Sequence, residues 1–164
     1  MSQAHLILVL ADQLGFDNPA LAQARPGIDR IVMAEVAEEA HYVRHNRHKI
    51  ALLFSAMRHF AEQLREEGFE VCYFRLSDGL TSLEAACAKA LEQAPAAELA
   101  LCAPGEYRLQ TAVRGWESTL GIPVHVHPDT RFLADLDAFA DWAKGRKQLR
   151  MEYFYRDMRK RDQL

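Results

Sequence analysis

The chain has 164 residues, with 20 lysines and arginines, 23 aspartates and glutamates and a net charge of −3 at pH 7. This length fits one domain that buries about 70% of its unfolded surface, and a charge so near zero excludes binding to nucleic acid or acidic membranes through the overall charge. The N-terminus lacks the cationic region of a signal peptide and no apolar run approaches the ~18 residues of a membrane helix, so we expect a cytoplasmic protein with no membrane partner.

Five short runs of apolar residues predict β-strands, at residues 6–10, 31–36, 71–74, 99–102 and 124–127. Runs that are apolar at almost every position are typical of strands buried on both faces, as in a parallel sheet. The connection between the first two runs is less regular, and we expect only a short helix there.

Helical patterns fill the intervals between the later runs. Apolar residues recur at helical spacing over Ile50–Leu64 and Leu109–Leu120, and the sequence Thr81–Glu84 predicts a capping box before a third helix. Strands that alternate with helices predict an α/β fold built on a doubly wound five-stranded parallel sheet. Residues 131–164 contain no sixth strand, so we expect an α/β domain over residues 1–130 followed by C-terminal helices.

In such sheets, ligands bind outside the carboxyl ends of the strands. Asp12, Gln13 and Leu14 directly follow the first predicted strand, and the two polar side chains can bond the edge of a flat heterocycle. The alternative, which the residues alone favour, is that Asp12 caps the following turn. No GxGxxG or GxxxxGK[ST] segment is present, so a standard dinucleotide or phosphate-loop site is not predicted.

Two polar clusters follow the second predicted strand. The carboxylates Glu35, Glu38 and Glu39 either line the crevice or form an ordinary solvated loop, and Tyr42 would add an apolar wall to a crevice. The basic segment Arg44–Lys49 indicates either an anionic group nearby or, more simply, a solvated basic face. His41, His45 and His48 would share a helix face, but we do not expect a metal site there, because the clustered arginines and lysine repel a cation and no thiolate lies adjacent.

Polar residues also follow the later strands. Glu106 and Arg108 predict either polar groups at the edge of the crevice or an ion pair within a strand-to-helix turn. His125 and His127 alternate on the fifth strand, which is more typical of polar groups at a sheet end than of metal ligands. Residues 151–161 interleave aromatic residues with arginines, a pattern that can bind nucleic acid by stacking and charge. The same pattern describes an amphipathic helix that docks on a further domain, and this is the interpretation we favour.

Catalytic constellations are missing from the sequence. There is no Ser/His/Asp arrangement, no nucleophile elbow and no CxxC pair. Cys72, Cys87 and Cys102 have neither the spacing of a zinc site nor that of a disulfide framework, so we expect thiols in the core. We therefore predict neither a catalytic residue nor a metal ligand in this chain.

Segments spread over nearly the whole chain carry one further signal. Residues 55–61 (SAMRHFA) and 151–156 (MEYFYR) are the most specific of them, and the others are residues 8–14, 35–43, 49–54, 104–108, 131–133 and 145–147. Together these segments resemble the N-terminal part of the bacterial iron–sulfur photolyases and cryptochromes, the (6-4) photolyase type that is also described as deoxyribodipyrimidine photolyase-related.

The resemblance implies a Rossmann-like N-terminal domain of a two-domain flavoprotein that either repairs damaged DNA with light or signals light. In this family the N-terminal domain binds an antenna chromophore, 6,7-dimethyl-8-ribityllumazine. A C-terminal helical domain, absent from this chain, binds FAD, an iron–sulfur cluster and, in the full-length protein, the damaged DNA. By similarity, the residues that would contact the antenna are Asp12, Gln13, Leu14, Val36, Glu39 and Tyr42.

Three positions depart from the family pattern. Ala11 stands where a glycine is expected, Asn46 replaces a histidine, and Ala103 replaces an acidic residue. Two other functions stay open at this point. The first is a stand-alone α/β protein-interaction module that docks a partner through its last helix, and the second is a nucleotide-binding module, which the missing glycine-rich loop disfavours.

Overall fold

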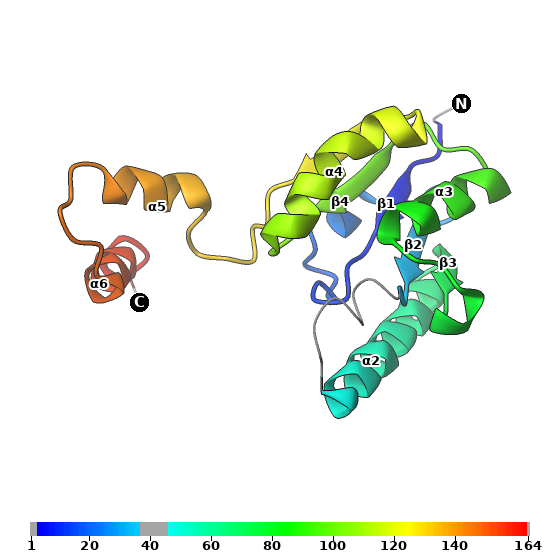
Figure 1. Ribbon diagram of the computed structural model, residues 1–164, viewed down its shortest axis with the longest axis horizontal. Helices are drawn as coiled ribbons and strands as arrows, with labels where there is room; N and C mark the ends of the chain where they lie inside the picture. The colour runs from blue at the N-terminus through cyan, green and yellow to red at the C-terminus, as the bar shows by residue number, and fades with distance from the viewer. Residues whose placement is uncertain (1–2, 37–45, 164) are drawn as a thin grey trace. The chain divides into compact units, whose positions relative to one another are not determined.

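The computed structural model describes residues 3–36 and 46–163. It divides the chain into two compact units, Met1–Pro128 and Asp129–Leu164. The first unit is an α/β domain and the second consists of two helices (Figure 1). Among the described residues, no helix combines the length and the apolar character needed to cross a lipid bilayer.

The first unit is built on one sheet of five parallel strands in the order β3-β2-β1-β4-β5 (Figure 1). The strands are β1 (Leu6–Leu8), β2 (Arg30–Ala34), β3 (Glu70–Phe74), β4 (Leu99–Cys102) and β5 (Val124–His127). The predicted strands and the doubly wound α/β fold are therefore confirmed. The bounds differ at four strand ends: β1 and β2 end two residues earlier than their apolar runs, and β2 and β3 begin one residue earlier.

The central strands are buried along their whole length, which explains why their sequences show no alternation. Every residue of β1, β2 and β4 is buried, whereas the edge strands β3 and β5 are partly exposed. Even Arg30 of β2 is buried, and its guanidinium donates hydrogen bonds to the carbonyl oxygens of Ala90 and Ala94. These carbonyls lie at the C-terminus of a helix, where a cation is favoured by the helix dipole.

Helices cover both faces of the sheet. α2 (Arg47–Glu66) lies on one face, and α3 (Leu83–Gln93) and α4 (Tyr107–Leu120) lie on the other (Figure 1). The core under α2 includes Ile31, Met33, Met57, Phe60 and Leu64. The core under α3 and α4 includes Leu8, Val32, Cys87, Leu101 and Trp116.

Side-chain caps set where two of these helices begin. Asn46 accepts a hydrogen bond from the backbone N–H of His48 at 2.8 Å and so caps α2. The predicted capping box is wrong by one residue, because Ser82 and not Thr81 caps α3, accepting from the backbone N–H of Ala85 at 3.1 Å. Two adjacent hydroxyl residues made both registers plausible, and the sequence alone does not separate them.

Asp29, the residue before β2, links the start of this strand to His5 and Arg25 through hydrogen bonds. Its carboxylate is fully buried and accepts hydrogen bonds from the backbone N–H of His5 at 2.9 Å and of Arg25 at 2.8 Å. The guanidinium of Arg25 adds two more, at 2.6 and 2.8 Å. Burial alone would raise the pKa of Asp29, but these donors outweigh it and lower the pKa to about 2. The β1–β2 connection, with its short helix η1 (Leu21–Gln23), is thereby anchored at its end.

Glu35 anchors the other end of β2. Its side chain is 1% exposed and accepts hydrogen bonds from Arg58 Nε at 2.6 Å, from Arg58 Nη2 at 2.9 Å and from the hydroxyl of Tyr73 at 2.7 Å. The backbone N–H of Leu76 donates a further bond at 3.1 Å. Burial by itself would raise the pKa of Glu35, but the four donors lower it. This carboxylate therefore joins β2, α2 and the end of β3.

The second unit consists of α5 (Leu136–Ala143) and α6 (Met151–Arg161). Three aromatic rings hold the two helices together, with centroids 5.2 Å apart between Phe139 and Phe154 and 5.2 Å apart between Trp142 and Phe154. The indole Nε1 of Trp142 also donates to Asp157 at 3.0 Å. Gly145 has φ = 72°, a left-handed conformation that favours glycine in the turn between the helices.

The lowered pKa of Asp29 predicts a contribution to stability that depends on pH. A carboxylate with a depressed folded pKa stabilises the fold above its unfolded pKa, which is 3.8 here, and loses that contribution as the pH falls toward its folded pKa of about 2. Between pH 5 and pH 2.5 the wild type should lose about 1.5 kcal/mol more free energy of unfolding than Asp29→Asn. Urea unfolding at both pH values measures this difference, and equal losses would contradict the assigned hydrogen bonds.

The network around Glu35 predicts a second effect on stability. Glu35→Gln removes the charge that receives the bonds from Arg58, so it should lower the free energy of unfolding by about 1–3 kcal/mol at pH 7. The matched control is Glu62→Gln on the same helix as Arg58, where the carboxylate is 67% exposed and its pairing with Arg65 should contribute less than about 1 kcal/mol. Urea unfolding compares the two variants, and similar losses would show that the Glu35 network does not stabilise the sheet.

Candidate functional site

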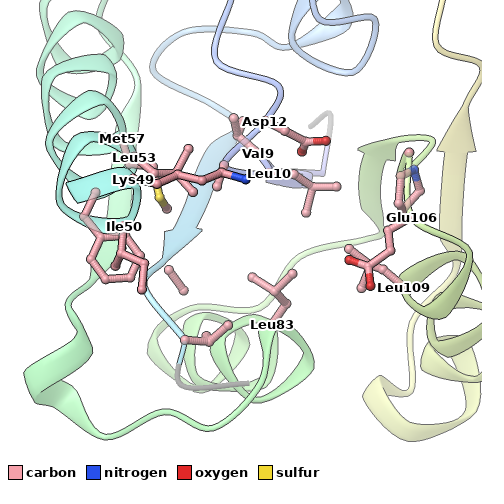
Figure 2. Close-up of a pocket in the computed structure, with 16 residues that line it drawn as sticks. Val9, Leu10, Asp12, Lys49, Ile50, Leu53, Met57, Leu83, Glu106 and Leu109 are labelled. Atoms are coloured by element: carbon pink, nitrogen blue, oxygen red, sulfur yellow. The ribbon is translucent and has the colours of Figure 1, made fainter. Parts of the chain in front are cut away.

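The candidate site is a cavity of about 290 Å³ at the carboxyl ends of β1, β2 and β4 (Figure 2). Its walls come from the residues after β1, from the end of β2, from one face of α2, and from the starts of α3 and α4. Most of the lining is apolar, including Leu10, Leu53, Met57, Leu83 and Leu109. This volume lies near the lower end of the range of about 300–1,000 Å³ that is usual for small-molecule sites.

The strand order explains why a cavity forms here. β1 lies between β2 and β4, and the chain leaves β2 toward the face covered by α2 but leaves β4 toward the face covered by α4. At such a switch point the connections diverge to opposite faces of the sheet and leave a crevice beyond the strand ends. The cavity thus follows from the topology, and the apolar residues of α2, α3 and α4 line it.

Three charged side chains, Asp12, Lys49 and Glu106, reach this apolar cavity from different elements. Figure 2 shows Lys49 extending from α2 toward the end of β1, near which Asp12 lies, and Glu106 approaching from the start of α4. Asp12 and Lys49 are exposed, whereas Glu106 is half-buried and accepts a hydrogen bond from Arg108 at 3.1 Å. Both interpretations of Glu106 from the sequence are thus realised, because it forms an ion pair and also lines the crevice.

Of the six residues that the sequence proposes as antenna contacts, two line the cavity, two do not, and two lie outside the described residues. Asp12 and Val36 line the cavity. Gln13 and Leu14 are not among the lining residues: Leu14 packs against the core under α2, and Gln13 is completely buried. The two remaining candidates are Glu39 and Tyr42, which lie outside the described residues, as do Glu38 of the carboxylate cluster and the histidines His41 and His45.

Gln13 braces the strand ends that frame the cavity. Its amide Nε2 donates to the carbonyl oxygen of Ala103 at 3.0 Å, so it ties the segment after β1 to the end of β4. Its Oε1 is buried and has no hydrogen-bond partner among the described residues. A buried oxygen without a partner costs about 1–3 kcal/mol, which makes this atom an available acceptor for a donor that reaches it.

The sequence did not identify the wall formed by α2. The basic segment that ends at Lys49 predicts either an anionic group nearby or a solvated face, and Ile50, Leu53 and Phe54 only follow helical spacing, yet all four residues line the cavity. One signal was available, because a helix that follows the second strand of a doubly wound sheet begins beside the carboxyl ends of the strands. Glu35, in contrast, does not line the cavity, because its carboxylate is buried in hydrogen bonds with Arg58 and Tyr73.

The other polar candidates have structural partners. Nε2 of His125 lies 3.2 Å from Glu98, whose other oxygen lies 3.3 Å from Nδ1 of His5, and Nδ1 of His127 lies 3.3 Å from the amide of Gln23. Within residues 3–36 and 46–163, no cluster of histidine, cysteine and carboxylate side chains has the geometry of a metal site. Among the described residues none of the three cysteines forms a disulfide, and burial raises the pKa of Cys72 and Cys87.

Comparison with known proteins identifies relatives of the whole chain. The family model described as "Deoxyribodipyrimidine photo-lyase-related protein" matches residues 7–164. A protein of Agrobacterium fabrum named "(6-4) photolyase" is 43% identical over 163 residues, which cover 98% of this chain and 32% of that protein. The chain therefore spans about a third of the length of this relative. From these matches we conclude that the chain belongs to the deoxyribodipyrimidine photolyase-related family.

Proposed function

We propose that this chain is the N-terminal, antenna-binding domain of a light-dependent (6-4) DNA photolyase or of a bacterial cryptochrome. The antenna would be 6,7-dimethyl-8-ribityllumazine, which absorbs light and passes the energy to FAD. The observation that carries the proposal is the cavity at the carboxyl ends of β1, β2 and β4, in a chain that belongs to a photolyase-related family.

The lining of the cavity supports a flat, partly polar ligand. Leu53 of α2 and Leu109 of α4 offer apolar side chains from opposite faces of the sheet, as a planar ring system requires. A lumazine ring also presents carbonyl oxygens and a ring N–H at its edge. The ammonium of Lys49 can donate to such carbonyls, and the carboxylates of Asp12 and Glu106 can accept from the N–H or from the ribityl hydroxyls.

The segments that follow β1 and β4 approach one another closely at the place where the edge of the ligand would lie. Gly105 lines the cavity after β4, and a Cβ atom built on it would lie 3.8 Å from Oδ2 of Asp12. The segments that follow β1 and β4 are therefore in near contact. The hydrogen bond from the Gln13 amide to the carbonyl oxygen of Ala103 links these two segments. In this proposal Gln13 keeps the polar edge of the site in place, while Asp12 and Val36 contact the ligand.

The second unit supports a partner domain. Its exposed apolar side chains are numerous for so small a unit and include Phe132, Leu133, Leu136, Leu149 and Met151, which are each more than half exposed. Exposed apolar surface of this kind marks an interaction site. The proposed partner is a C-terminal helical domain that carries FAD and an iron–sulfur cluster. Repair of damaged DNA, or light signalling, would then belong to the two domains together.

Filling the cavity should abolish antenna binding. Leu53→Trp adds an indole to the wall that α2 contributes, so the affinity for 6,7-dimethyl-8-ribityllumazine should fall by at least about tenfold. The matched control is Leu52→Trp, because Leu52 is the preceding residue of the same helix, is 72% exposed and does not line the cavity. Fluorescence anisotropy of the lumazine, titrated with each protein, measures both affinities.

The possible outcomes separate the proposal from its rivals. The proposal requires wild type and Leu52→Trp to bind alike and Leu53→Trp to bind weakly or not at all. No binding by folded wild type at high micromolar ligand would refute the antenna role. An equal loss of affinity in both variants would indicate that the ligand binds outside this cavity. Binding of ATP or NAD in place of the lumazine would instead indicate a nucleotide-binding module.

A further inference from the structure

The charge of the chain is unevenly distributed. Residues 144–161 hold eight lysines and arginines and only two carboxylates, although the chain as a whole has a net charge of −3. These residues form the turn after α5 and the whole of α6. A basic segment in an otherwise acidic chain indicates a local partner with negative charge, because the overall charge would not attract one.

The fold of the second unit separates an inner and an outer face of α6. Phe154 packs on Phe139 and Trp142 of α5, and Arg161 donates to the carbonyl oxygen of Leu133 at 2.6 Å. Phe154, Asp157, Met158 and Arg161 follow helical spacing and therefore share this inner face. The outer face carries two tyrosines, three cations and one carboxylate, namely Tyr153, Tyr155, Arg156, Arg159, Lys160 and Glu152, all of them exposed.

Several cations of the segment are already neutralised within the unit. Lys144 pairs with Asp141 at 2.5 Å, Arg156 with Glu152 at 2.8 Å and Arg161 with Asp162 at 2.7 Å. Lys147 and Lys160, in contrast, form no ion pair with any carboxylate that the structure describes. The ammonium groups of Lys160 on the outer face and of Lys147 in the turn are therefore available to an external partner.

The outer tyrosines orient cations. The guanidinium of Arg159 lies 5.8 Å from the centroid of the Tyr155 ring, and that of Arg150 lies 5.9 Å from the centroid of the Tyr153 ring. These distances are within the range of cation–π attraction. Since each ring already has a guanidinium over it, the rings are poor platforms for stacking an unpaired base. The face is better suited to a rigid array of phosphates than to single-stranded bases.

We propose that the outer face of α6, with the turn before it, contacts the phosphate backbone of duplex DNA. The choice of DNA rests on the proposed function, since the basic face itself would accept any polymer with regularly spaced phosphates. These contacts would be independent of sequence and would position the duplex, as phosphate contacts generally do. They would add affinity outside any site that recognises the lesion.

A protein partner on the outer face is the main alternative. The exposed apolar residues of the unit argue against it, because none of the five named above belongs to the outer face itself. Phe132, Leu133 and Leu136 lie before or at the start of α5, and Leu149 and Met151 lie at the end of the turn and at the first position of α6, before Glu152, the first residue of the outer face. The apolar surface is the one suited to a protein domain, and the outer face of α6 bears charges on long, exposed side chains. The two surfaces can therefore serve two different partners.

The test compares two charge-neutralising double variants of the full-length protein. Arg159→Gln with Lys160→Gln removes two charges from the outer face of α6. Lys89→Gln with Arg114→Gln, at exposed positions of α3 and α4, removes the same two residue types from the other unit. Anisotropy of a labelled, undamaged 25-base-pair duplex, titrated with each protein at several NaCl concentrations, gives the affinity and its salt dependence.

The α6 variant should bind the duplex about tenfold more weakly near 0.1 M salt, and the slope of log K against log salt should shrink by about two. The control should match wild type. Unchanged affinity and slope in the α6 variant, or equal losses in both variants, would overturn the proposal. So would tighter binding of a single strand than of the duplex, coupled to a loss on Tyr155→Leu. Lumazine binding should be the same in all proteins, and if even wild type fails to bind lumazine, the DNA result still stands on its own.

Discussion

The position of β1 between β2 and β4 is the constraint on which the rest of the structure depends. Its neighbours send the chain to opposite faces of the sheet, so a crevice opens beyond their carboxyl ends. Two polar contacts keep this geometry in place. Glu35 ties the end of β2 to Arg58 of α2, and Gln13 ties the segment after β1 to the end of β4. The cavity, its apolar walls and its charged rim all follow from this arrangement.

Much of the fold could be predicted because unbroken apolar runs in the sequence indicate strands that are buried on both faces. The unbroken apolar runs of β1, β2 and β4 correspond to strands in which every residue is buried, and α4 ends at Leu120, where the predicted helical pattern also ends. Local chemistry was harder to predict. Thr81 and Ser82 offer equivalent hydroxyls, so the choice of cap depends on tertiary packing.

The sequence indicates the location of the cavity but not which residues line it. Asp12, at the end of β1, lies at the cavity, but the neighbouring Gln13 is buried and donates to the carbonyl oxygen of Ala103 after β4. Sequence position alone does not tell which of two adjacent polar side chains faces a crevice. The contribution of Lys49 was missed because its basic neighbours suggested a solvated face, and only the fold shows that the first turn of α2 borders the crevice.

The central claim is that a flat chromophore binds beyond the ends of β1, β2 and β4. The most direct measurement is ¹H–¹⁵N NMR of the chain during titration with 6,7-dimethyl-8-ribityllumazine. If the chromophore binds there, the largest shifts should occur at the backbone amides of Asp12, Lys49 and Gly105, with small shifts at β5 and in the second unit. Shifts centred on His125 and His127, or confined to α5 and α6, would contradict the claim.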